Sequence, residues 1–250
     1  DQSLRNFTQF LCLLCKIRAV SKCLLNQRIC IEHDDTENDA DDGKRLDQTD
    51  RDQRTREENA ARLRLTCQTL NEAARDKLLR YIMSEKNLKM IAIAGTHGKT
   101  TTTGMMIWVL RQLGVPISYS IGTTISFGPS GHYAPNSEYF IYECDEFDRN
   151  FLHFSPYLSL ITSIDYDHPD TYPTQAAYTR AFQQFLGQSE LSILWKKDTL
   201  TGLEPVNKSW VLKDEEVKSF RIPGWHNRAN ATLVAKACER LKLGNPDIVK

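Results

Sequence analysis

From residue 89 onward, the sequence predicts an α/β fold in which helices flank a mostly parallel sheet. Short apolar runs that suit buried strands alternate there with longer stretches whose apolar residues repeat at helical spacing. Of the twelve glycines, only Gly43 precedes Gly95, so the turns that such a fold needs are concentrated in this part of the chain. This alternation is typical of parallel sheets that are covered on both faces.

The first expected unit is a strand, a loop and a helix. Met90–Ala94 is a short apolar run, and the helix that follows has apolar residues at positions i, i+3, i+4 and i+7, starting at Met106, before Gly114 and Pro116 end the pattern. Later apolar runs predict three more strands, at Tyr139–Glu143, Leu158–Ile164 and Leu191–Trp195. Helical spacing predicts two more helices, at Thr174–Leu186 and Arg228–Leu241.

Residues 1–70 differ from the rest of the chain. Between His33 and Ala60 the only large apolar residue is Leu46, so this charged segment cannot bury enough surface to offset its ordering entropy. We expect it to be poorly ordered or a solvated helix, and an acidic interaction tail is the alternative. We therefore expect an atypical segment at 1–70, a helical linker at 71–88 and a nucleotide-binding domain at 89–250.

Cysteines in the first segment raise the alternative of a zinc site. A Cys-x-x-Cys pair occurs there, but it fits an apolar helix equally well, and no matching pair follows. The four cysteines concerned are Cys12, Cys15, Cys23 and Cys30. The total of seven cysteines, odd in number and unevenly spaced, fits reduced thiols in a cytoplasmic protein.

Composition argues against two classes of partner. Thirty-two basic residues balance thirty-two acidic ones, so the net charge does not suggest nucleic-acid binding. No run of eighteen or more apolar residues occurs, so we expect no membrane insertion.

Gly95–Thr100, with the sequence GTHGKT, has the ending of a phosphate loop. In such loops glycines let backbone N–H groups approach phosphate oxygens at a helix N-terminus. Lys99 would then pair with the β- and γ-phosphates, and the Thr100 hydroxyl would bind Mg²⁺. The general pattern asks for glycine where Ile93 stands, and an ordinary glycine turn capped by threonines is the alternative.

Three further motifs follow this loop in order. The chain has YECDEFDRNFL at 142–152, TSIDYDHPDTY at 162–172 and IPGWHNRANATLVAKA at 222–237. With the loop GTHGKTTTT, these stretches resemble the central ATPase domain of the Mur ligases over residues 73–250, about the linker and central domain of longer family members. Because it contains a histidine, the loop is most similar to that of the family members that join L-alanine to UDP-N-acetylmuramate.

The resemblance implies a role for each matching residue. Glu143 and His168 would be metal ligands together with Thr100, and Asn227 and Asn230 would contact adenine. The loop residues that would contact ATP are Gly95, Thr96, His97, Gly98, Lys99, Thr100 and Thr101. Asp145 and Glu146 are expected to line the site.

Two of these residues have simpler explanations. His168 could be a hydrogen-bonded loop histidine beside Pro169, and imidazole is an unusual ligand for Mg²⁺. Asn227 could cap a helix that begins at Arg228. Ser163 stands where the family usually has asparagine, which puts the network around the metal loop in doubt.

The activity implied by the resemblance is ATP-dependent amide ligation through an acyl phosphate, with UDP-N-acetylmuramate and L-alanine as substrates and ATP and Mg²⁺ as cofactors. The alternatives are a murein tripeptide ligase, a folylpolyglutamate synthase, or a nucleotide-binding module without catalysis. The family's uridine-nucleotide domain and C-terminal domain have no counterpart in the sequence. We therefore expect a partial ligase whose ATPase domain follows an unrelated or incorrectly read segment.

Overall fold

The structure, a computed structural model, describes residues 76, 79–206, 208–217 and 220–244. The predictions for the charged segment at 1–70 and for zinc at its four cysteines lie outside the described residues. From Leu79 onward the described residues belong to one compact unit. No helix in this described part of the chain is long and apolar enough to cross a membrane.

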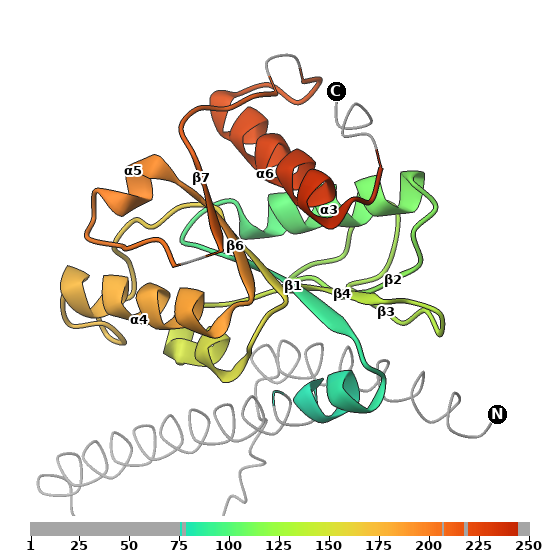
Figure 1. Cartoon of the computed structure of the whole chain (residues 1–250), viewed down its shortest axis with the longest axis horizontal. Coiled ribbons are helices and arrows are strands. Elements are labelled where there is room, and N and C mark those ends of the chain that lie inside the picture. Colours follow the sequence, from blue (N-terminus) through green and yellow to red (C-terminus); the bar gives the residue numbers. More distant parts are fainter. Residues whose placement is uncertain (1–75, 77–78, 207, 218–219, 245–250) are drawn as a thin grey trace, which may run out of the picture. The chain divides into compact units, whose positions relative to one another are not determined.

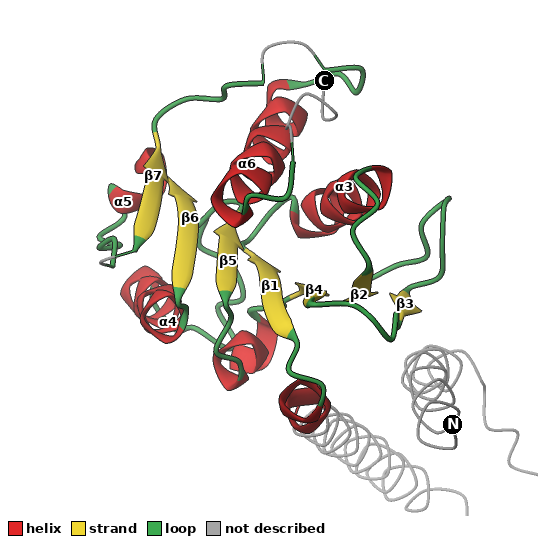
Figure 2. Ribbon diagram, turned by 45° about the vertical axis from the view of Figure 1, so that its right-hand side comes forward, coloured by secondary structure: helices red, strands yellow, loops and turns green. Residues whose placement is uncertain are grey.

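A seven-stranded sheet forms the centre of this unit (Figure 1). The strands follow the order β3-β2-β4-β1-β5-β6-β7, which can be traced in Figure 2. The central strand β1 (Lys89–Ala94) pairs in parallel with β4 (Tyr139–Glu143) and with β5 (Leu158–Ile161). The remaining strands are β2 (Ile117–Ser120), β3 (Gly131–His132), β6 (Leu191–Trp195) and β7 (Ser209–Leu212). Among the strand pairs of the described sheet, only that of β2 with β3 is antiparallel, so the predicted mostly parallel sheet is confirmed.

Helices cover both faces of the sheet (Figure 2). On one face, α3 (Lys99–Gln112) and α6 (Trp225–Leu241) pack in the same apolar cluster as Ile91 and Ile93 of β1. On the other face, α4 (Gln175–Gln188) packs in the cluster that holds Met90 of β1. Two short elements follow β4 and β6, the 3₁₀ helix η1 (Phe147–His153) and the helix α5 (Lys196–Thr199). Because alternate side chains of a strand point to opposite faces, β1 joins the two cores.

Some boundaries differ from the predicted ones. The last helix begins at Trp225 rather than Arg228, because Gly224, with φ of 103°, ends the preceding loop just before it. The strand predicted at Leu158–Ile164 ends at Ile161. The chain then turns toward the glycine loop after β1, where the Ser163 carbonyl accepts a hydrogen bond from the Thr96 N–H.

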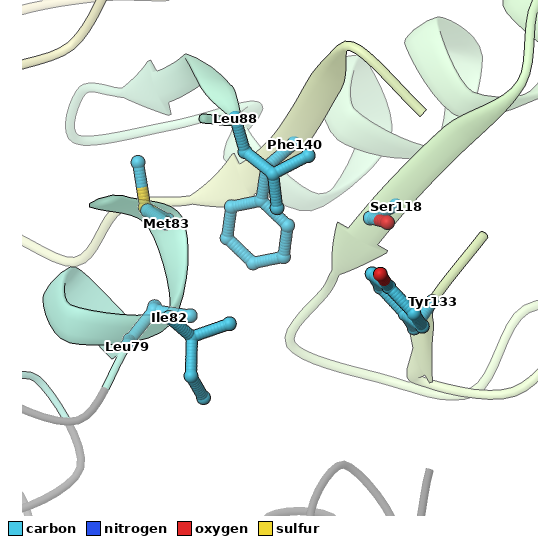
Figure 3. Close-up of a pocket in the computed structure, with 7 residues that line it drawn as sticks. All are labelled: Leu79, Ile82, Met83, Leu88, Ser118, Tyr133 and Phe140. Atoms are coloured by element: carbon cyan, nitrogen blue, oxygen red, sulfur yellow. The ribbon is translucent and has the colours of Figure 1, made fainter. Parts of the chain in front are cut away.

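Residues 79–85 are helical and lie near the amino end of β1 (Figure 2). A pocket there is bordered by this helix, by the start of β4 and by β2 (Figure 3). Its lining is mainly apolar and consists of Leu79, Ile82, Met83, Leu88, Ser118, Tyr133 and Phe140. None of the described side chains that line the pocket carries a formal charge.

Candidate functional site

The loops that follow β1, β4 and β5 meet at the carboxyl edge of the sheet. The Thr96 hydroxyl lies 2.7 Å from the carbonyl oxygen of Asp165, to which it donates, and 2.8 Å from the hydroxyl of Tyr178. The N–H of His97 donates to the Ser163 hydroxyl at 3.2 Å, so the residue that departs from the family pattern is bonded to the glycine loop. Ligands of open parallel sheets bind at this edge.

The glycine loop is shaped by two residues in which φ is positive. Gly95 has φ of 130°, and a Cβ atom there would overlap the Thr162 hydroxyl. Gly98 has φ of 85°, and its Cβ would lie 2.9 Å from Oδ1 of Asn230. Gly98 is also the N-cap of α3, where no side chain caps the helix. The first N–H groups of a helix have no intrahelical partner, so this turn can receive a phosphate.

Lys99, the first residue of α3, is bonded on three sides. Its Nζ donates to the Gly95 carbonyl at 2.8 Å and to the two carboxylate oxygens of Glu146 at 2.7 and 3.0 Å. The Glu146 side chain is fully buried. Burial raises the pKa of the Glu146 carboxyl, and the ammonium of Lys99 opposes that shift.

Glu143 lies at the end of β4 and meets the helix α3. The Thr100 hydroxyl donates to its Oε1 at 2.7 Å, and the Gly122 N–H donates to its Oε2 at 2.5 Å. Mg²⁺ takes oxygen ligands in an octahedron whose adjacent ligands are about 3 Å apart, a separation close to that of the Thr100 and Glu143 oxygens. These two residues therefore fit as a partial magnesium site.

His168 is not bonded to either of those residues. It has φ of 55°, and its Nε2 lies 3.7 Å from Oε1 of Glu146 and 3.8 Å from Oδ2 of Asp167. Its ring packs edge-on against Phe147, at 5.3 Å between ring centroids. Among the described residues, no group of three or more His, Cys, Asp or Glu side chains could hold a metal ion. His168 as a metal ligand therefore stays a prediction.

The two asparagines of α6 differ in their surroundings. Asn230 is buried, and its side chain lies against Gly98 of the loop. Asn227 is partly exposed and donates from Nδ2 to the Pro223 carbonyl at 2.6 Å. The alternative that Asn227 caps a helix beginning at Arg228 is wrong, because the helix begins two residues before Asn227. These contacts do not test whether the two asparagines bind adenine, or whether exposed Thr101 binds ATP. Both roles stay predictions.

Two residues at this edge were not predicted. Gly122 holds Glu143, as described above, and no motif in the sequence marks it. Asp198 of α5 is 3% exposed, and its Oδ1 accepts the Ile164 N–H at 3.3 Å. Its Oδ2 has no hydrogen-bond partner among the described residues. Burial raises the pKa of the Asp198 carboxyl to about 6. Asp198 is the third residue after the buried strand β6, and this closeness to the carboxyl end of a strand was the available signal.

Comparison with known proteins agrees with the motifs. Residues 93–202 match the family model of the Mur ligase middle domain. The UDP-N-acetylmuramate–L-alanine ligase of Salinispora arenicola is 48% identical over 97 residues, which cover 39% of this chain and 19% of the relative. The enzyme of the same name from Lactiplantibacillus plantarum is 40% identical over 174 residues, which cover 58% of this chain and 38% of the relative. The chain thus spans less than half the length of these relatives.

Solved structures share the fold. The UDP-N-acetylmuramate-alanine ligase of Thermotoga maritima superposes with a TM-score of 0.58 and 23% identity, over 69% of this chain and 46% of the other. A ligase of Neisseria meningitides, for UDP-N-acetylmuramate and L-alanyl-gamma-D-glutamyl-meso-diaminopimelate, gives a TM-score of 0.53 and 24% identity over 65% and 64%. At this identity the likeness concerns the fold alone.

Proposed function

We propose that this chain binds ATP with Mg²⁺ and serves in ATP-dependent amide ligation, because residues 93–202 match the family model of the Mur ligase middle domain. The observation that carries the proposal is the glycine loop, with Lys99 and Thr100 directly behind it and Glu143 bonded to Thr100. Cation, hydroxyl and carboxylate are the groups that phosphoryl transfer needs, since it depends on positioning and charge neutralisation.

In the proposed reaction, a substrate carboxylate oxygen attacks the γ-phosphorus of ATP, the bond from that phosphorus to the β-phosphate oxygen breaks, and ADP leaves while an acyl phosphate forms. An amine then attacks the acyl carbon, the bond from that carbon to the phosphate oxygen breaks, and inorganic phosphate and a proton leave as the amide forms. Lys99 and the first N–H groups of α3 would hold the β- and γ-phosphates. Thr100 and Glu143 would hold Mg²⁺, with His168 as a further ligand; this ion neutralises phosphate charge when bound. Asn227 and Asn230 would face the adenine side of the nucleotide. The reaction requires no covalent intermediate on a protein side chain.

We propose UDP-N-acetylmuramate and L-alanine as the substrates, which makes the reaction a step in peptidoglycan precursor synthesis. Support comes from the printed names of the relatives that are 40–48% identical over parts of this chain. The substrate pair is tested by phosphate release with L-alanine and UDP-N-acetylmuramate, in parallel with a murein tripeptide and with folate plus glutamate. If phosphate release depends instead on the murein tripeptide, or on folate plus glutamate, those compounds are the substrates. Nucleotide binding without any release would favour a noncatalytic module.

Nucleotide binding itself is tested by Lys99→Ala. We expect the variant to lose at least about tenfold in affinity for a nonhydrolysable ATP analogue, because a charge-assisted contact with two phosphates is removed. Calorimetric titration gives the affinity. Lys89→Ala is the matched control, since this exposed lysine pairs with Glu138 at the start of β1, away from the loop. Equal affinity of the Lys99→Ala variant and the wild-type protein would refute the loop assignment.

A further inference from the structure

Lys99 has no free donor in this arrangement. An ammonium group carries three N–H donors, and Nζ of Lys99 has three acceptors within 3.0 Å, namely the Gly95 carbonyl and both oxygens of Glu146. A phosphate that enters the glycine loop must therefore replace at least one of these acceptors. Glu146 is the acceptor with a full negative charge, so it is the principal competitor of an incoming phosphate.

The backbone around Glu146 is held in place by neighbouring groups. The Tyr172 hydroxyl donates to the Glu146 carbonyl at 2.6 Å, and the Arg149 N–H donates to the same oxygen at 3.0 Å. Directly after Glu146, η1 packs on α4, where Phe151 and Phe182 have ring centroids 5.0 Å apart. The carboxylate is therefore presented to Lys99 from a fixed backbone rather than from a loose loop.

A buried carboxylate also needs a partner after the lysine has turned away. An unpaired charge in the interior strongly destabilises the folded state. Nε2 of His168 lies 3.7 Å from Oε1 of Glu146, so a small movement of the ring would let an imidazole N–H donate to that oxygen. Glu146 thus lies between Lys99 and His168, and its carboxylate can replace a hydrogen bond from the lysine with one from the histidine.

We propose that Glu146 is a positioning residue of the nucleotide site, which holds Lys99 while the loop is empty and competes with the nucleotide phosphates for it. This inference rests on the proposed nucleotide binding. It assigns to Glu146 a function that lowers nucleotide affinity, which a residue with a purely structural role would not have. The same contact keeps the Lys99 ammonium beside the Gly95 carbonyl of the loop, where a β- or γ-phosphate can reach it.

The test is Glu146→Gln, which keeps the shape of the side chain and removes its charge. Titrated with a nonhydrolysable ATP analogue in the full chain, this variant should bind about fivefold more tightly or better, because the phosphates no longer compete with a carboxylate for the lysine. Asp148→Asn is the matched control. It removes the same charge from an exposed position two residues away, where φ of 50° suits asparagine, and it should leave the affinity within about twofold.

The outcomes separate this inference from the proposed function. If the wild-type protein does not bind the analogue, the proposed function fails. If it binds and Lys99→Ala weakens binding, but Glu146→Gln is unchanged or weaker, the competition is refuted and the function stands. Should Glu146→Gln fail to fold, Tyr172→Phe replaces it. That variant removes the hydroxyl that holds the Glu146 backbone and should tighten binding to a smaller extent, so unchanged or weaker binding there would also refute the competition.

Discussion

At the scale of single residues, the position of the Glu143 carboxylate depends on a glycine. A Cβ atom on Gly122 would lie 2.8 Å from each Glu143 oxygen, closer than a carbon and an oxygen can approach without movement. The Gly122 N–H also donates to that carboxylate. Gly122 therefore sets how near the loop after β2 can come to the proposed magnesium ligand.

We expect Gly122→Ala to displace Glu143 and to reduce the gain in nucleotide affinity that Mg²⁺ provides, by about tenfold, the effect typical of disturbing a residue that supports a metal ligand. Titrations with and without Mg²⁺ measure that gain. The control is Gly187→Ala in α4, where an added Cβ meets no atom within 4 Å. The control should keep the Mg²⁺ effect and raise the free energy of unfolding by about 0.5–1 kcal/mol. An unchanged Mg²⁺ effect in Gly122→Ala would contradict the role of this glycine.

Residues with a sequential pattern could be predicted, and residues defined by a contact in space could not. The glycine loop gave Lys99 and Thr100, because phosphate loops need those residue types in a fixed order. The pairing of Lys99 with Glu146 spans 47 positions and follows from the fold rather than from a motif. Gly122 lies 21 positions from Glu143, and only the pairing of β2 beside β4 brings the two together.

At the scale of elements, Asp198 links α5 to the loop that follows β5, through its bond from the Ile164 N–H. Its pKa is raised from 3.8 to about 6, first because burial disfavours the charged form, while Lys197 opposes the shift and Asp165 adds to it. A carboxyl whose pKa is higher in the folded state binds more protons there. Its contribution to stability is therefore complete below about pH 4 and is lost as the pH rises to about 6.

We expect Asp198→Asn to remove this part of the pH dependence. In the wild-type protein, the free energy of unfolding should fall by up to about 3 kcal/mol between pH 4 and pH 7 from this group alone. The amide of asparagine can still accept the Ile164 N–H and does not titrate. Urea denaturation at both pH values measures the difference. A fall of equal size in the variant would mean that other groups cause it.

Elements with a strong pattern were predicted closely. Strands β4 and β6 have the predicted bounds, and α4 begins one residue after Thr174, whose side chain caps it by accepting the Ala177 N–H. The short strands β2, β3 and β7 were missed, because two to four residues carry too little pattern. The 3₁₀ helix η1 was missed because Asp148 and Arg149 both adopt positive φ, a conformation that is uncommon for residues other than glycine and that no motif in the sequence marks here.

At the scale of the whole molecule, the described helix at residues 79–85 shares a core with the sheet. Leu79 is buried in the same cluster as Met90 of β1 and Phe140 of β4. Ile82 is buried as well and lines the pocket together with Phe140 (Figure 3). A linker that joins independent parts would leave its side chains exposed. We propose that this helix is an integral part of the folding unit whose carboxyl edge carries the candidate site, so that both are lost in one transition.

Ile82→Ala and Tyr81→Ala test this on adjacent positions of one helix, since the side chain of Ile82 is 8% exposed and that of Tyr81 is 62% exposed. Truncation of a buried isoleucine costs about 2–5 kcal/mol, whereas exposed positions usually change stability by about 0.5 kcal/mol or less. Near-ultraviolet circular dichroism reports on buried aromatic residues of the sheet such as Trp195, and the far-ultraviolet signal reports on the helices. We expect Ile82→Ala to lower the unfolding midpoint equally in both signals. The two signals should coincide because one cooperative unit unfolds. A helix signal that is lost first, with the near-ultraviolet midpoint unchanged, would make residues 79–85 a separate linker after all.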